Sequence, residues 1–321
     1  MRTSIYIFIS LILALNTNSI QAQITPSSYE KIDYLITFGK NADKTWGDDD
    51  YTQVHFFVVP AAIKTPVYIR VFDPQIGGQY DTKNGSFDSK TSFSLYGGKH
   101  CFSKKEAQQV DPVNGYDSGR LIKKKVFGNE SEYDNKWYTF GPVNPSEGEY
   151  SDKFKGYVFK MICEGVEGND GNAYKYSLSK EKNHNVSIEN GNIFTYEMTF
   201  KLDNDKNVKA HIYPFITKDI ESITINTFDA DDDIHIRITS IGRKLEKANV
   251  SLNGKWSSTL INILTKEYNS SIDIQLIQKK TINNDMTLHI LNQYKNAIPL
   301  FSVPIGGKPS YAYKVKIKYN F

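Results

Sequence analysis

The chain has 321 residues, enough for two ordinary domains, and 13% of them are aromatic, including 21 Tyr and 18 Phe. Tyr, Phe and β-branched residues suit the pleated, half-buried surface of a β-sheet, so this composition favours a β protein. The formal net charge of +3 at pH 7 is close to neutral for such a length, which argues against nucleic acid as a partner.

The first 22 residues have the pattern of an export signal. Arg2 supplies a positive charge, residues 5–15 (IYIFISLILAL) form an apolar run, and a short polar stretch leads to the small residue Ala22. The apolar run is shorter than the roughly 20 residues that a membrane-spanning helix needs. We therefore predict a signal peptide over residues 1–22, cleaved after Ala22, with no transmembrane segment in the mature chain. The expected location is the periplasm, the outer membrane as an associated protein, or the outside of the cell.

Alternation of apolar and polar residues predicts β-strands through residues 23–180. Val54, Phe56 and Val58 lie on one face of the first clear example, and His55 lies on the other face, where we expect contact with solvent. The same period recurs at residues 67–71, 157–161 and 174–178, with turn-rich stretches between. This pattern predicts a first antiparallel β-sandwich.

The rest of the chain contains two irregular stretches and a second run of strands. Residues 100–150 have too few apolar side chains to bury a core, so we predict a long loop insertion in the first sandwich. The polar stretch 181–192 (EKNHNVSIENGN) predicts a linker. Alternation resumes after it and predicts a second sandwich over residues 193–321. The predicted fold class is all-β, with two tandem antiparallel β-sandwich (jelly-roll or Ig-like) domains after a cleaved signal peptide.

Two stretches of the first half resemble a known family. They are residues 46–68, which open W-G-D-D-D-Y-T-Q-V-H-F-F-V-V-P, and residues 156–178, which read G-Y-V-F-K-M-I-C-E-G-V-E-G-N-D-G-N-A-Y-K-Y-S-L. Together they resemble the pre-peptidase C-terminal (PPC-like) β-sandwich domain. The resemblance implies a β-sandwich that serves as a non-catalytic accessory module. The chain departs from the family's pattern between Cys101 and about Ser151.

Motifs of catalysis are missing from the sequence. It contains no G-x-S-x-G, no H-E-x-x-H, no phosphate-binding loop and no G-x-G-x-x-G, and its six His residues are scattered. We therefore predict that the protein is not an enzyme, with an unrecognised hydrolase as an alternative.

Acidic clusters at strand entries are the strongest candidates for a binding site. Loops at the ends of a sandwich can offer the carboxylate and carbonyl oxygens that Ca²⁺ requires. The candidate ligands are Asp48, Asp49 and Asp50 together with Asp73, and separately Asp229, Asp231 and Asp233. Alternatively, each of these aspartates forms a turn, and its side chain caps local backbone N–H groups.

Aromatic and sulfur-containing side chains give two weaker predictions. Trp46, Trp137 and Trp256 each adjoin turn-like sequence, where an exposed ring can stack on a sugar; core packing is the alternative. Cys101 and Cys163 are the only cysteines, and in an oxidising compartment they could form a disulfide; two separate buried thiols are the alternative.

The sequence as a whole predicts an exported, non-catalytic binding or structural module of the cell envelope or the extracellular space, with Ca²⁺ as a candidate stabilising ion. The expected partner is an envelope protein or a glycan, and a glycan-binding accessory protein is the second reading. The alternating residues 313–321, which end in Phe321, predict the closing strand of the second sandwich. Their alternative is the last strand of an outer-membrane β-barrel.

Overall fold

The computed structural model describes residues 23–110, 114–202, 205, 208–279 and 285–309. The predicted signal peptide (1–22) and the predicted closing strand (313–321) lie outside these residues. Within them the strands pair antiparallel and the helices are short 3₁₀ turns, so the all-β prediction is confirmed. No helix in these ranges has the length and apolar character to cross a membrane. The 3₁₀ turns are η1 (Lys44–Trp46), η2 (Lys105–Gln108), η3 (Ser131–Tyr133), η4 (Pro145–Glu147) and η5 (Thr265–Glu267).

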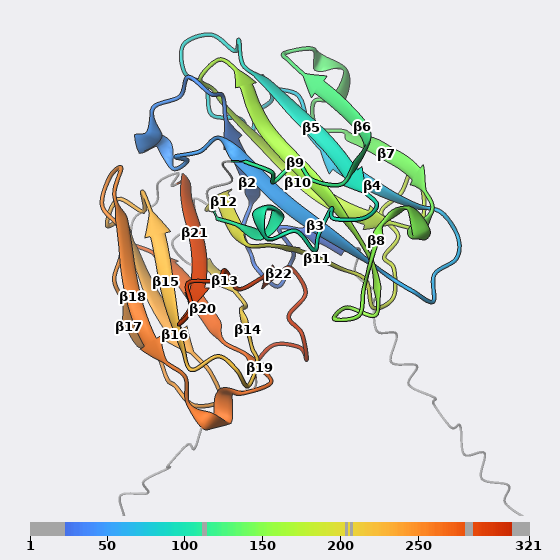
Figure 1. Cartoon of the computed structure of the whole chain (residues 1–321). Helices are drawn as coiled ribbons and strands as arrows, with labels where there is room; N and C mark the ends of the chain where they lie inside the picture. The colour runs from blue at the N-terminus through green and yellow to red at the C-terminus, as the bar shows by residue number, and fades with distance from the viewer. Residues whose placement is uncertain (1–22, 111–113, 203–204, 206–207, 280–284, 310–321) are drawn as a thin grey trace, which may run out of the picture.

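The largest sheet runs through both halves of the chain (Figure 1). Its order is β18-β15-β21-β12-β2-β10-β4-β7, with β1 alongside β10. The halves join at the antiparallel pair β2–β12, in which Leu35 lies opposite Phe200. The strands are β1 (Gln23–Thr25), β2 (Tyr34–Phe38), β4 (Val67–Phe72), β7 (Trp137–Val143), β10 (Gly171–Ser179), β12 (Glu197–Lys201), β15 (Ser222–Phe228), β18 (Trp256–Asn262) and β21 (Asp285–Asn292).

Two further sheets complete the layers; the first also joins the halves, since β11 and β22 of the second half pair alongside β3. The seven-stranded sheet has the order β22-β11-β3-β9-β5-β6, with β8 paired to β9, and the four-stranded sheet has the order β13-β20-β16-β17. A small β14-β19 ladder adjoins them. The strands are β3 (Thr52–Pro60), β5 (Lys90–Gly97), β6 (Arg120–Phe127), β8 (Glu149–Ser151), β9 (Gly156–Glu167), β11 (Asn192–Thr195), β13 (Lys209–Ile212), β14 (Phe215–Ile216), β16 (Ile234–Thr239), β17 (Glu246–Ala248), β19 (Ser270–Ser271), β20 (Asp273–Gln278) and β22 (Leu300–Phe301).

One continuous apolar core lies between these layers. Its members come from the facing sheets of both halves and include Phe57, Phe159, Val71 and Tyr176 in the first half and Ile225, Leu288, Ile236 and Leu276 in the second. The period-two alternation arises because every second side chain of a strand points into this core. The core therefore crosses the boundary between the halves, as the largest sheet does.

A second apolar cluster covers the outer face of β3. Phe56 stacks on Phe194 of β11 with ring centroids 5.1 Å apart and meets Phe102 edge-on at 5.5 Å. His55 lies on the opposite face of β3, which it shares with the core residue Phe57, so it is buried rather than solvated as predicted, with 1% of its surface exposed. Burial lowers the pKa of its imidazole to about 3.

The segment 181–192 leads the chain directly back onto the first half. The hydroxyl of Ser179 accepts the N–H groups of Glu181 and Val186, both at 3.0 Å, which closes a turn. Strand β11 begins at Asn192 and pairs with β3, so that Phe194 lies opposite Phe56. The segment thus connects β10 of the largest sheet to β11 of the seven-stranded sheet.

Residues 100–150, expected to form a loop, contribute the three strands β6, β7 and β8. The expectation was missed because β6 is an edge strand with the sequence RLIKKKVF, and most of its side chains are exposed. Lysines on an edge strand block pairing with other chains, and they also remove the apolar alternation that reveals a strand.

The predicted disulfide is wrong, since Cys101 and Cys163 are both free and buried. The Cys101 thiol donates to the carbonyl of Val158 at 3.2 Å on the outer face of β9. Cys163 lies five residues further along β9 and points into the core between the sheets. An offset of five along a strand places two side chains on opposite faces and roughly 16 Å apart, which a disulfide cannot span.

Candidate functional site

The loop after β2 contacts the second half of the chain at β21 and at Trp256. Thr287 of β21 donates its hydroxyl to the Gly47 carbonyl at 2.7 Å, and the Trp256 indole donates to Asp49 Oδ2 at 2.9 Å. Gly47 has a φ of +95°, and a Cβ there would lie 2.5 Å from the Asp285 carbonyl oxygen. Only glycine fits this close approach.

A pocket with a volume of about 190 Å³ opens beside this contact. We call it the acidic pocket, and it is lined by Phe38, Thr45, Trp46, Thr82, Asn84, Asp229, Asp231 and Asp285. The first five residues come from the first half of the chain and the three carboxylates from the second. The acidic pocket therefore exists only when the two halves are assembled.

The carboxyl groups of the acidic pocket have raised pKa values, because they are buried and lie close to one another. Burial, together with the charges of Asp231 and Asp285, raises the pKa of Asp229 to about 7. Burial also raises the pKa of Asp231, the hydrogen bond with Asn253 opposes this rise, and the charge of Asp233 adds to it. Asp229 Oδ1 accepts the N–H of Gly254 at 2.5 Å, which fixes its orientation.

Asp285 is the residue of the acidic pocket with a vacant hydrogen-bonding position. Its Oδ2 lies 3.4 Å from the Thr82 hydroxyl, while its Oδ1 is buried without a hydrogen-bond partner in the described structure. Burial raises the pKa of Asp285 to about 6 against the opposing charge of Lys201. A buried acceptor without a donor costs free energy, so this oxygen favours a ligand that donates a hydrogen bond or carries positive charge.

The predicted acidic group at Asp48–Asp50 does not converge on one point. Asp48 accepts the N–H groups of Tyr51 at 2.9 Å and Asp50 at 3.2 Å, which is the turn-forming alternative. Asp49 reaches outward to Trp256, and Asp50 Oδ1 accepts the Thr52 N–H at 2.9 Å. Among the residues that the structure describes, no group of three or more His, Cys, Asp or Glu side chains is arranged to hold a metal ion.

Of the three tryptophans, two lie at the acidic pocket or beside it, and the third lies in another part of the first half. Trp46 lines the acidic pocket and packs against Phe38 at 6.3 Å, and Trp256, 40% exposed, lies at the neighbouring contact with Asp49. Trp137 is elsewhere, packed against Phe72 at 5.4 Å and the guanidinium of Arg70 at 5.1 Å.

Of the residues that line the acidic pocket, sequence alone identified Trp46, Asp229 and Asp231. It missed Thr82, Asn84 and Asp285, because nothing in their local sequence distinguishes them from turn and strand-edge residues.

Two histidines pair with carboxylates, as a general base would. His211 Nδ1 lies 2.8 Å from Asp273 Oδ1, and His289 Nδ1 lies 2.6 Å from Glu197 Oε2. Among the described residues, neither imidazole is hydrogen-bonded to a serine, threonine or cysteine side chain that could act as a nucleophile.

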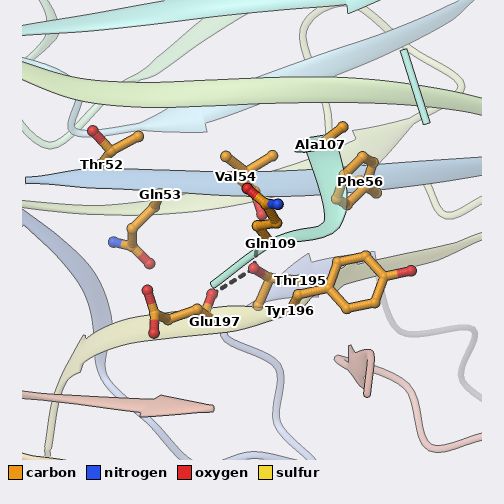
Figure 2. Close-up of a pocket in the computed structure, with 9 residues that line it drawn as sticks. All are labelled: Thr52, Gln53, Val54, Phe56, Ala107, Gln109, Thr195, Tyr196 and Glu197. Atoms are coloured by element: carbon orange, nitrogen blue, oxygen red, sulfur yellow. Dashed lines mark hydrogen bonds between the residues drawn. The ribbon is translucent and has the colours of Figure 1, made fainter. Parts of the chain in front are cut away.

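A second hollow, beside β3 and β11, is too small for a ligand. Figure 2 shows its nine lining residues, among them Gln53, Tyr196 and Glu197. Its volume of about 10 Å³ accommodates roughly one water molecule. Of these two hollows, the acidic pocket is therefore the better candidate site.

The raised carboxyl pKa values predict how stability depends on pH. The groups are Glu30, Asp48, Asp81 and Asp229 at about 7, and Asp73 and Asp285 at about 6. A carboxyl whose pKa is higher in the folded chain contributes stability below its unfolded pKa, and this is lost as pH rises through its folded pKa. His55 acts oppositely, and its contribution is lost as pH falls from about 6.5 toward 3. With chelator present, we expect the melting temperature to fall between pH 5.5 and pH 8, as measured by calorimetry.

Glu30→Gln isolates one of these groups, because Glu30 is 1% exposed and accepts the Ser27 N–H at 2.6 Å. A pKa difference of one between folded and unfolded chains corresponds to about 1.4 kcal/mol. The variant is expected to be more stable than the wild type by about 1–3 kcal/mol at pH 8, and equally stable near pH 4. A variant with an unchanged pH profile contradicts the explanation.

The family of this chain is shown neither by protein-family models nor by curated proteins. No protein-family model matches it, and no curated protein matches it. The PPC-like resemblance therefore stays a prediction.

Proposed function

We propose that the protein is an exported, non-catalytic binding module of the cell envelope or the extracellular space, and that the acidic pocket binds a glycan. The single observation that carries the proposal is the acidic pocket itself, in which acceptor oxygens face a cavity flanked by Trp46. Export follows from the signal pattern of residues 1–22.

The chemistry of the acidic pocket suits a sugar ring. The hydroxyl groups of a sugar donate hydrogen bonds, and the buried Asp285 Oδ1 lacks a donor. The ring of Trp46 offers an apolar surface for the face of a sugar, and Asn84 and Thr82 supply groups that both donate and accept. Three carboxylates in one pocket further favour an amino sugar, whose positive charge offsets theirs.

The test is binding of the purified mature chain to an array of immobilised neutral and amino sugars, followed by calorimetry with the best ligand. Asp285→Asn and Trp46→Ala are expected to weaken binding about tenfold or more, since each removes a contact inside the pocket. Asp152→Asn and Trp137→Phe are matched controls, because Asp152 has a 90% exposed side chain and Trp137 is outside the pocket. Absence of binding to any sugar, or equal binding by all four variants, contradicts the proposal.

A further inference from the structure

We propose that the turn after β4 binds a calcium ion through Asp73, Asp134 and Asn172. The three residues come from separate parts of the first half: the end of β4, the turn after η3 and the start of β10. The inference is independent of the glycan proposal, because none of the three lines the acidic pocket.

The turn after β4 and the turn after η3 are held together by main-chain bonds. The Asp73 N–H donates to the Lys136 carbonyl at 2.9 Å, and the Asn135 N–H donates to Asp73 Oδ1 at 2.9 Å. Asp73 and Asn135 both have left-handed backbones, with φ of +52° and +56°. These bonds place the carboxylates of Asp73 and Asp134 near one another, so that the charge of Asp134 raises the pKa of Asp73.

Strand β10 brings Asn172 to the same turn. Its Nδ2 donates to the carbonyl of Pro74 at 2.8 Å, which fixes the orientation of its amide. The next residue, Ala173, donates its N–H to Asp81 Oδ1 at 2.8 Å. The N–H groups of Gly77 and Gly78 donate to the other oxygen of Asp81, so this carboxylate organises the turn.

The group contains buried acceptors that lack donors. Asp73 Oδ2, Asp134 Oδ1 and Asn172 Oδ1 are each buried without a hydrogen-bond partner in the described structure. Asp73 is 0% exposed and Asn172 1% exposed, so bulk water does not reach them. Orphaned acceptors of this kind are rare in native proteins, and a cation is the ligand that satisfies several acceptors at once.

Gly78 lies directly against the Asp73 carboxylate. A Cβ at Gly78 would lie 3.2 Å from Asp73 Oδ2 and 3.3 Å from Oδ1, so a side chain there would press on the two oxygens. Calcium takes carboxylate and amide oxygens at about 2.3–2.6 Å in flexible geometry, whereas magnesium retains most of its water. The third proposed ligand is an amide oxygen. The site therefore agrees with the finding that no group of three or more acidic, His or Cys side chains is arranged to hold a metal ion among the described residues.

Calorimetric titration of the chelator-treated mature chain with CaCl₂, paired with thermal melts, tests the proposal. The wild type is expected to bind calcium with a rise in melting temperature, and Asp134→Asn to weaken binding about tenfold or more. Gly78→Ala is expected to abolish the response while near-ultraviolet circular dichroism still shows a folded chain. Asp152→Asn, the same change at an exposed site, is expected to bind as the wild type does.

A second measurement locates the ion. Trp137 follows Lys136, whose carbonyl accepts the Asp73 N–H, so terbium bound at this turn is expected to emit after excitation of Trp137. Trp137→Phe should remove most of this emission and Trp256→Phe little of it. The proposal is overturned if the wild type does not respond to calcium, if Asp134→Asn responds normally, or if the response is lost in Asp285→Asn instead. Terbium emission that depends on Trp256 would also overturn it.

Discussion

Separate expression of residues 23–180 and 193–321 is expected to give two fragments that do not fold alone. The cut removes β12 from the edge of β2, where Phe200 lies opposite Leu35, and β11 from the edge of β3. It also exposes Phe56, which is 0% exposed in the whole chain and stacks on Phe194. Bare strand edges and exposed aromatic rings favour aggregation over folding.

Near-ultraviolet circular dichroism and thermal melts of each fragment, alone and after mixing, measure this effect. We expect neither fragment to show a cooperative transition alone, and co-expression to recover soluble, folded complex. A fragment that melts cooperatively at the temperature of the whole chain would show instead that the halves are independent domains. That result would support the tandem-sandwich organisation predicted from the sequence.

Glu267→Ala is expected to destabilise the chain by about 3–5 kcal/mol, because it removes the buried carboxylate from a buried cation and leaves only the exposed Glu246 to pair with it. Glu267 is 0% exposed, and its Oε1 accepts from Arg243 Nε at 2.8 Å. Its Oε2 accepts from Arg243 Nη2 at 3.1 Å and from the Leu264 N–H at 2.7 Å. The Arg243 side chain is 8% exposed, so water cannot replace the lost carboxylate.

Glu246→Ala is the matched control, since Glu246 pairs with the same Arg243 at 2.7 Å but is 48% exposed. Its loss is expected to cost about 1 kcal/mol or less, as for other exposed ion pairs. Urea denaturation of both variants gives the free energies of unfolding. Equal losses in the two variants would mean that burial does not decide the strength of this pair.

Much of the local structure follows from the sequence, and the failures have physical causes. Alternation located β3, β9, β10 and β16, because each presents one face to a core. It failed at β6, an edge strand dominated by lysines. It also assigned the wrong environment to His55, which lies in the core-facing row of β3 together with Phe57 and packs against Tyr176.

The candidate site was predictable only in part. Trp46 and the acidic residues Asp229 and Asp231 were identified by residue type and turn context, and the structure brings them into one pocket. Asp285 was not identified, since a single aspartate at the start of a strand carries no signal. Its role depends on Gly47, whose close approach joins a loop of the first half to β21.

The sequence by itself determined that this protein is built from antiparallel β-structure, because side-chain period is a local property of a strand. Only the tertiary structure decided that the halves share a sheet through β2 and β12. It also decided that Cys101 and Cys163 lie on opposite faces of β9 and that the acidic pocket forms between the halves. The reason is that strand partners and pocket walls are set by contacts between residues far apart in the chain, which no local pattern records.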